Sequence, residues 1–254
     1  MTLTLVLIAI GALLFLVIIY NIIQQYRQKQ EAEKRALLLK QKNIISETDE
    51  LLLNASQLPY SKALMLILHN RIHACLQIMQ QNDPRNSQVE TRIGNIREQL
   101  TQLKDHYQME SEGLKPPESD QHAIHLLQVV KRLRAVLRAE HNKRKVGTQT
   151  FIHEDRRLEL IQLKINLSNL IKRARMAFEN RENALARQML EKGLKVLEPL
   201  PDKDEQLKRI EETLQARLDE LTNKQSKVQQ EQQEREEQQE SSELDMLFQP
   251  KRKW

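Results

Sequence analysis

Residues 3–23 read LTLVLIAIGALLFLVIIYNII and contain no charged side chain. As a helix this stretch would be roughly 31 Å long, which matches the hydrocarbon thickness of a bilayer. A helix satisfies its own backbone hydrogen bonds in lipid, so it can insert without a partner segment. The pattern therefore predicts a single transmembrane anchor over residues 1–23. Only two residues precede the apolar run, unlike the basic start of a cleavable signal peptide, so we expect the anchor to be retained.

The segment that follows the anchor predicts its orientation. Residues 24–43 form a basic juxtamembrane segment, with six Lys or Arg against two Glu. Positive charge next to a membrane helix stays on the cytoplasmic side. The chain also has one cysteine, Cys75, and so cannot form an internal disulfide, which is typical of a reducing compartment. We expect a protein of a bacterial inner membrane, with a short N-terminus outside and the rest in the cytoplasm.

The composition favours long helices. Glycine (5) and proline (7) are scarce, aromatic residues are 4% of the chain, and charged residues are 30%. No run of alternating β-branched residues bounded by turns follows the anchor. The predicted fold is therefore all-α: an N-terminal transmembrane helix, then an elongated helical bundle or solenoid-like domain, then a coiled-coil or disordered tail.

Proline, glycine and polar breaks divide the chain after the juxtamembrane segment. The predicted segments are a first helical unit (44–112), a linker (113–120), a basic helix (121–147), a second helical unit (148–222), a Gln/Glu-rich spacer (223–240) and a tail (241–254). Within them, apolar residues three and four apart predict helices over residues 61–81, 86–109, 121–145, 153–178 and 183–197, and one that begins near 202. Ser46 and Asp49 resemble a capping box that would begin a helix just ahead of Leu51.

The two helical units resemble each other when one is shifted by 118 positions. Without gaps, this shift brings apolar residues onto apolar residues at ten positions. The pairs are Leu52/Leu170, Leu53/Ile171, Tyr60/Phe178, Ile72/Leu190, Leu76/Leu194, Ile78/Val196, Val89/Leu207, Ile96/Leu214, Leu100/Leu218 and Leu103/Leu221. The pattern is expected either from a duplicated three-helix unit or from two unrelated helical stripes brought into register.

Residues 178–199 carry an aromatic at the start, small residues seven apart at Ala186 and Gly193, and a proline at the end. This stretch resembles the second helix of a tetratricopeptide-type repeat. It lacks that family's 34-residue period and the Trp, Gly and Tyr of its first helix. The resemblance implies a helical scaffold that binds peptides or partner proteins.

The strongest basic cluster lies on the predicted helix 121–147. It consists of Lys131, Arg132, Arg134, Arg138, Lys143, Arg144 and Lys145. A solvated helix face would account for it, and so would a surface for anionic lipid headgroups or nucleic acid. The cluster has no aromatic residues for base stacking, so nucleic acid is the less favoured partner.

Catalytic and cofactor signatures are missing from the sequence. His69 and His73 share a helix face, but the HExxH pattern is absent, and we expect them to be ordinary helix residues. The sequence contains no glycine-rich phosphate loop, no CxxC pair and no nucleophile motif. We therefore expect neither an enzyme nor a bound cofactor or metal.

The chain's end combines a polar spacer with a small apolar cluster. Residues 223–240 predict a solvated helix or a disordered spacer, and residues 203–240 could pair copies of the chain through a coiled coil. The apolar cluster either docks on a partner or folds back on the bundle, and the long spacer favours docking. Its residues are Leu244, Met246, Leu247, Phe248 and Trp254.

Together these patterns predict a single-pass, membrane-anchored cytoplasmic scaffold or adaptor for protein–protein interactions. The expected partners are the lipid bilayer and cytoplasmic proteins not yet identified. The alternative is a membrane-associated protein that binds anionic lipid or nucleic acid through residues 131–145.

Overall fold

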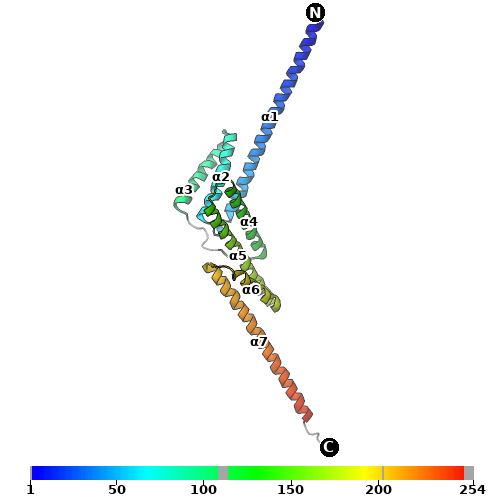
Figure 1. Cartoon of the computed structure of the whole chain (residues 1–254), viewed down its shortest axis with the longest axis vertical. Helices are drawn as coiled ribbons and strands as arrows, with labels where there is room; N and C mark the ends of the chain where they lie inside the picture. Colours follow the sequence, from blue (N-terminus) through cyan, green and yellow to red (C-terminus); the bar gives the residue numbers. More distant parts are fainter. Residues whose placement is uncertain (1, 108–113, 202, 249–254) are drawn as a thin grey trace. The chain divides into compact units, whose positions relative to one another are not determined.

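The structure is a computed structural model. It describes the backbone of residues 2–107, 114–201 and 203–248, and side chains from Ile18 to Lys224 within these ranges, with a few beyond. All regular elements in the described residues are helices, which confirms the all-α class (Figure 1). They are α1 (Thr2–Leu53), η1 (Asn54–Ser56), α2 (Lys62–Asn82), α3 (Ser87–Asp105), α4 (Asp120–Asn142), α5 (Thr148–Glu179), α6 (Asn183–Leu197) and α7 (Glu205–Phe248).

The chain divides into two compact units. Unit 1 comprises residues 1–114 and 129–158, and unit 2 comprises residues 115–128 and 159–254. Two of the three boundaries fall inside long helices, so α4 and α5 each contribute residues to both units. The stretch 121–147, which the sequence sets apart as one basic helix, is therefore shared between them.

Polar side chains begin several helices where the sequence predicts a start. The Ser61 hydroxyl accepts a hydrogen bond from the Leu64 amide at 2.9 Å, and Ser119 accepts one from the His122 amide at 3.0 Å. Such caps satisfy amide groups that have no partner within the helix. The predicted helix 183–197 is confirmed as α6, and α2 and α3 begin within a residue of their predicted starts.

The predicted helix start at Ser46 is wrong, because α1 continues through it to Leu53. Ile45 and Leu51 on this turn are 5% and 0% exposed, and Thr48 donates a hydrogen bond to the Ile44 carbonyl at 2.7 Å. Packing of one buried face keeps the helix continuous through this turn. Ser46 therefore lies inside a helix, where it cannot act as an N-terminal cap.

The turn after α4 lies earlier than the sequence predicts. The predicted break is at Gly147, but the chain reverses at Arg144, whose φ of 57° is in the left-handed region. The Lys145 amide then donates to the Glu140 carbonyl at 3.0 Å. Helix α5 ends in the same way, with Arg181 at φ 64° and the Glu182 amide on the Ala177 carbonyl at 2.9 Å. This is the usual hydrogen-bond pattern of a helix C-terminus, formed here without glycine.

In unit 1, the end of α1 packs with α2 and α3, and we call these three helices the first triplet. Helices α2 and α3 lie side by side, joined by a short turn (Figure 1). One side of each helix is buried in a shared cluster, as the apolar spacing predicts. The buried members are Ile45, Ile72, Cys75, Leu76, Val89, Ile93, Ile96 and Leu100.

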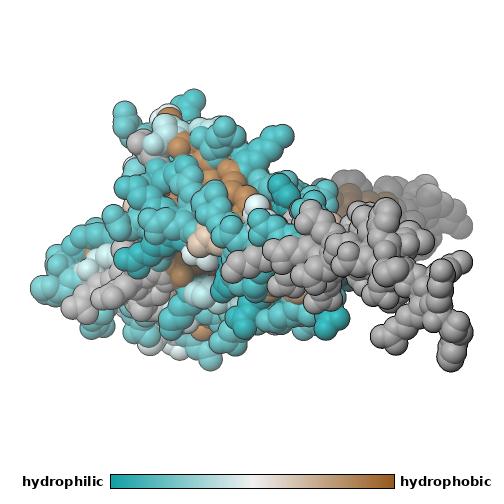
Figure 2. Space-filling model, turned by 90° about the horizontal axis from the view of Figure 1, so that it is seen from below, coloured by the Kyte–Doolittle hydropathy of each residue, from teal (hydrophilic) through white to brown (hydrophobic). Residues whose placement is uncertain are grey.

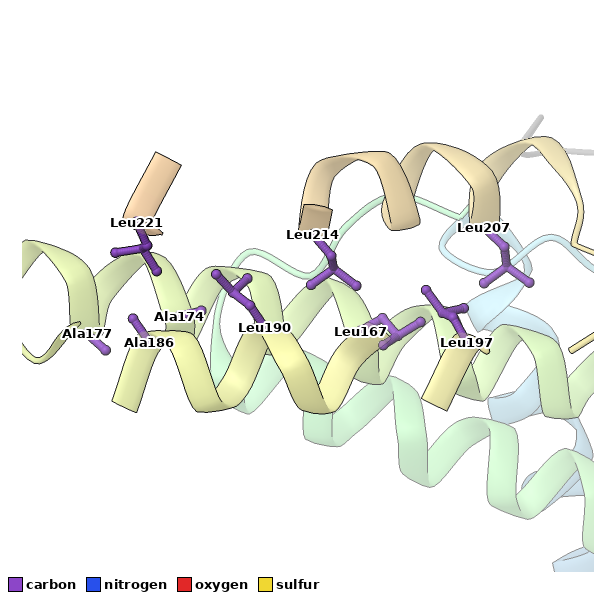
Figure 3. Close-up of a cluster of buried hydrophobic side chains, with 9 residues drawn as sticks. All are labelled: Leu167, Ala174, Ala177, Ala186, Leu190, Leu197, Leu207, Leu214 and Leu221. Carbon is purple, nitrogen blue, oxygen red and sulfur yellow. The ribbon is translucent and has the colours of Figure 1, made fainter. Parts of the chain in front are cut away.

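In unit 2, residues 159–179 of α5 pack with α6 and the first part of α7, and we call these the second triplet. Leu207, Leu214 and Leu221, seven residues apart on α7, point toward α6 and α5 (Figure 3). The small residues of the tetratricopeptide-like stretch lie in this interface, since Ala186 is 0% exposed. A Cβ added to Gly193 would lie 3.0 Å from side-chain atoms of Leu170 and Leu214. Gly193 therefore leaves space that side chains of α5 and α7 fill.

Several pairs predicted by the 118-residue shift occupy matching positions in the two triplets. Ile72 and Leu190, Val89 and Leu207, and Ile96 and Leu214 are buried in their respective clusters. The shift also matches two buried positions on the second helix of each triplet, Leu68 with Ala186 and Cys75 with Gly193. The order of helices is the same in both triplets.

Most of the predicted anchor lies outside the described side chains, which begin at Ile18. Among the residues that were described, no helix combines the length and the apolar character needed to cross a membrane. Figure 2 shows one face of the molecule, on which hydrophilic residues cover most of the described surface.

Candidate binding sites

The second triplet contains a cavity of about 280 Å³ between α5 and α7. Its apolar lining includes Ile171, Phe178, Leu190 and Leu221. Two prolines of the linker before α4 line it as well, and polar residues complete the wall. The remaining lining residues are Pro116, Pro117, Ser168, Lys172, Ala174, Arg175, Thr213, Arg217 and Glu220. We call this cavity the second groove.

Cations surround the second groove. Lys224 lies over the Phe178 ring, 4.4 Å from its centroid, and donates to Glu220 at 2.9 Å. Arg217 also donates to Glu220, at 2.9 Å. Hydrogen bonds from Lys224 and then Arg217 lower the pKa of the Glu220 carboxyl, so it stays ionised.

Two further cations lie on the α5 side of the second groove. Lys172 donates to the Glu118 carbonyl, and Arg175 donates to the Glu179 carboxylate at 2.9 Å. The rim therefore presents Lys172, Arg175, Arg217 and Lys224 against the carboxylates of Glu179 and Glu220, and it carries net positive charge.

The first triplet contains a cavity of about 300 Å³, which we call the first groove. Its lining is richer in neutral polar and aromatic groups. The residues are Ala55, Tyr60, Met65, His69, Gln99, Gln102, Leu103, His106 and Tyr107. Tyr60 donates its hydroxyl to the Leu51 carbonyl at 2.7 Å, and Tyr107 donates to the Tyr60 carbonyl. Burial raises the pKa of Tyr60, so its hydroxyl stays protonated.

The two grooves overlap in position at one aromatic residue and along the third helix of each triplet, although residues of α2 line the first groove and residues of α5 line the second. The 118-residue shift brings four lining residues of one groove onto four of the other, and two of these pairs are not among the apolar matches that define the shift. The pairs are Tyr60/Phe178, Gln99/Arg217, Gln102/Glu220 and Leu103/Leu221. In addition, His106 of the first groove corresponds to Lys224, which covers Phe178. The first groove thus lies between Tyr60, which follows α1, and one face of α3. The second lies between Phe178, in the last turn of α5, and one face of α7.

The grooves differ in charge. Three cations that line the second groove correspond to uncharged residues of the first triplet, of which Gln99 lines the first groove. The pairs are Asn54/Lys172, Gln57/Arg175 and Gln99/Arg217. The apolar position of Leu103 and Leu221 and the aromatic position of Tyr60 and Phe178 keep their character. The shape of the site is thus shared, whereas the charge of its rim is specific to the second triplet.

The predicted basic cluster on α4 lies in unit 1, where five of its seven side chains lie within 4 Å of one of three carboxylates. Arg132 binds Glu50 through two hydrogen bonds of 2.8 Å. Arg134 binds Asp155 at 2.8 and 2.9 Å, and Arg138 lies 3.9 Å from the same carboxylate. Lys143 and Lys145 lie 2.9 and 3.8 Å from Glu140, whereas Lys131 and Arg144 are exposed. Binding of anionic headgroups or nucleic acid by these seven residues stays a prediction.

The Arg134–Asp155 pair predicts a pH-dependent contribution to stability. Hydrogen bonds from Arg134 lower the pKa of Asp155 below its unfolded value, so the pair stabilises the fold above that value and loses its effect as pH falls through the folded pKa. Asp155→Asn should therefore lower the free energy of unfolding by about 1 kcal/mol at pH 7, since both side chains are partly exposed. Thermal unfolding from pH 7 down to pH 2 checks this. An equal loss at both ends of the range would contradict it.

The histidines are engaged separately. His69 Nδ1 lies 2.8 Å from the Met65 carbonyl, and because a carbonyl only accepts, this nitrogen carries the proton. His73 Nε2 accepts a hydrogen bond from Arg97 at 3.4 Å. Within the described part of the chain, no three His, Cys, Asp or Glu side chains are grouped so that they could hold a metal ion.

The side chains of the predicted docking tail lie outside the described residues. Leu244, Met246, Leu247 and Phe248 belong to α7 by their backbone, and Trp254 lies beyond the described chain. Their role as a docking segment stays a prediction.

Sequence reasoning missed both grooves, although the shift that relates them was available. A comparison of the charges at equivalent positions would have marked Lys172, Arg175 and Arg217 as a difference between the two triplets. No protein-family model, curated protein or solved structure matches the chain. The function must therefore be argued from the grooves and from the chain's own ends.

Proposed function

We propose that this protein is a membrane-anchored helical scaffold that binds segments of partner proteins in the grooves of its two triplets. The observation that carries the proposal is that both grooves lie beside the matched aromatic residue and the matched positions of the third helix. A void left by imperfect packing in one triplet gives no reason for a second at the matching place. A duplicated unit whose copies both keep a binding site accounts for it.

The lining of the second groove suits a peptide ligand. An apolar floor beneath a few charged groups is the usual composition of a site that takes one or two side chains of a peptide and fixes their orientation. A cavity of about 280 Å³ has room for such side chains. No catalytic role is proposed for either groove.

The membrane anchor is proposed from its sequence and from the exposed side chains at its end. Ile18, Ile19, Ile22 and Ile23 are 55%, 38%, 60% and 48% exposed on α1. Tyr20 and Tyr26, at 65% and 63%, lie where aromatic side chains mark the headgroup level. Contiguous exposed isoleucines are unfavourable in water and favourable in lipid. In this proposal the triplets lie in the cytoplasm, which the basic residues after the anchor support.

Topology can be tested with single cysteines. In a Cys75→Ala background, one cysteine replaces Thr2 and another replaces Ser241. An impermeant thiol reagent added to intact cells should label the first site and reach the second only after lysis. Labelling of residue 241 and not residue 2 on intact cells would show the opposite orientation, and labelling of both would exclude a spanning anchor.

The second groove can be tested by filling it. Thr213 lines the groove, and Thr213→Trp places an indole across it. We expect the partner proteins that co-purify with the full chain after cross-linking to fall by roughly tenfold, which corresponds to about 1.4 kcal/mol. The measurement is quantitative mass spectrometry of the purified complexes.

Thr222→Trp is the matched control. Both threonines are exposed on α7, and each hydroxyl donates to the carbonyl four residues earlier, Thr213 to Arg209 at 2.7 Å and Thr222 to Leu218 at 2.9 Å. Thr222 does not line the groove. An unchanged set of partners in Thr213→Trp, at an unchanged thermal midpoint, would contradict the proposal.

A further inference from the structure

We propose that the second groove binds the acidic, apolar segment at residues 239–248 of a second copy of this chain. The inference deepens the proposed function and rests on it, because it names the occupant of one of the two grooves. It assigns a partner to the tail segment that the sequence marks as a docking peptide.

The groove supplies an apolar floor inside a positive rim. Phe178, Leu190 and Leu221 line its apolar part, and the four cations of the rim outnumber the two carboxylates. Glu220 is already held by Arg217 and Lys224, at 2.9 Å from each. Three of the four cations already pair with these two carboxylates, but the excess of cations leaves the rim positive toward added negative charge. Such a site selects apolar side chains flanked by carboxylates.

The tail has the complementary composition. Residues 239–248 read QESSELDMLF, with three acidic residues, no basic residue and four large apolar residues at the end. The acidic residues alternate with the apolar residues or precede them. The acidic side chains can therefore contact the positive rim while the apolar side chains contact the floor. No other stretch of ten residues that the sequence places outside the triplets' cores combines these features.

The geometry of α7 makes the contact intermolecular. Helix α7 runs unbroken from Glu205 to Phe248, and its Leu221 lines the groove. From Leu221 to Leu244 the helix rises by roughly 35 Å. The segment of the same chain is therefore carried away from its own groove, while the segment of a neighbouring chain can reach it.

Membrane anchoring favours this contact. Chains confined to one membrane meet at a high effective concentration, so a groove with modest affinity for a short peptide would still be occupied.

The first groove offers an internal contrast, because its equivalent positions include Asn54, Gln57 and Gln99 instead of cations. It should not take the acidic segment.

The test is a cross-link in the full chain. Benzoylphenylalanine replaces Phe248, and two differently tagged forms of the chain are co-expressed and irradiated in membranes. We expect a cross-linked dimer that contains both tags, joined within residues 168–178 or 213–221. Cross-links within one chain only, or to the first triplet, would overturn the proposal.

Charge reversal identifies the contact. Arg175→Glu with Arg217→Glu should lower the dimer yield by roughly fivefold or more, and so should Glu243→Lys with Asp245→Lys. Combining the two pairs of changes should restore most of the yield. The matched control is Arg187→Glu, which reverses the charge of an exposed side chain on α6 outside the groove. This change should leave the dimer yield unchanged.

Failure of this inference is distinguishable from failure of the proposed function. If the charge reversals leave both the dimer yield and the thermal midpoint unchanged, the tail does not bind in the groove. If Thr213→Trp still removes other partner proteins in that case, the groove remains a binding site for a different occupant. If neither result depends on the groove, the proposed function fails as well.

Discussion

Replacing Glu140 by leucine is expected to lower the free energy of unfolding by about 3–5 kcal/mol, the usual cost of leaving one member of a buried ion pair without its partner. Glu140 on α4 lies 2.9 Å from Arg71 on α2, and their side chains are 3% and 9% exposed. Without Glu140, Arg71 keeps only Glu47, at 3.5 Å. The guanidinium would then lie in the interior of unit 1 with too little negative charge around it.

Replacing Arg71 should lower the free energy of unfolding by less than replacing Glu140. After Arg71→Met, Glu140 still has Lys143 at 2.9 Å and Lys145 at 3.8 Å, both exposed enough to reposition. The double variant should be more stable than Glu140→Leu alone, since neither charge is then left buried. Thermal unfolding of the solubilised full chain, followed by circular dichroism, should show a midpoint lower by about 10 °C for Glu140→Leu. The prediction fails if the two single variants lose equal free energies of unfolding and the double variant loses their sum. That result would show that the two side chains are not coupled.

Gly193→Leu should destabilise the second triplet by about 3 kcal/mol, the upper part of the range for overpacking. A Cβ at this position already comes within 3.0 Å of Leu170 and Leu214, and three further carbons would have to enter the same space. The helices must separate, and Leu190 and Leu207 then lose contact as well. Chemical unfolding monitored by circular dichroism would give the change in free energy.

Gly94→Leu is the control for helix propensity. Gly94 lies in α3 with nothing within 4 Å of an added Cβ, so the same substitution there should stabilise the helix by up to about 1 kcal/mol. Gly193→Ala should fall between the two, because the flexible ends of two leucines can yield by a few tenths of an ångström. A stable Gly193→Leu protein would mean that α6 does not pack against α5 and α7 in this register.

The local features of this chain could be predicted from its sequence. Helix α6 has its predicted bounds, and the apolar residues predicted to be buried on α2 and α4, such as Leu68 and Leu133, are 0% exposed. These features follow from spacing along one helix, because a 3.6-residue period puts such side chains on one face whatever the rest of the chain does. The predicted cap at Ser46 failed where packing of α1 outweighed a local hydrogen-bonding preference.

Charge assignments needed the tertiary structure. Arg134 and Asp155 are 21 positions apart, Arg132 and Glu50 are 82 apart, and nothing in the sequence connects them. The sequence shows how many cations a helix carries, but it does not show which of them pair with acids of other helices. The electrostatic interaction depends on distances in space and on burial, and the order of residues specifies neither.

By itself, the sequence determined the all-α class and the buried faces of helices such as α2 and α3, because both depend on the spacing of apolar residues. Only the tertiary structure decided that Arg71 and Glu140 meet in the interior, that Leu170 and Leu214 fill the space at Gly193, and that each triplet leaves a groove beside Tyr60 or Phe178. Those features depend on how side chains from different helices fill or fail to fill the space between them, and packing of that kind is fixed by the whole set of contacts.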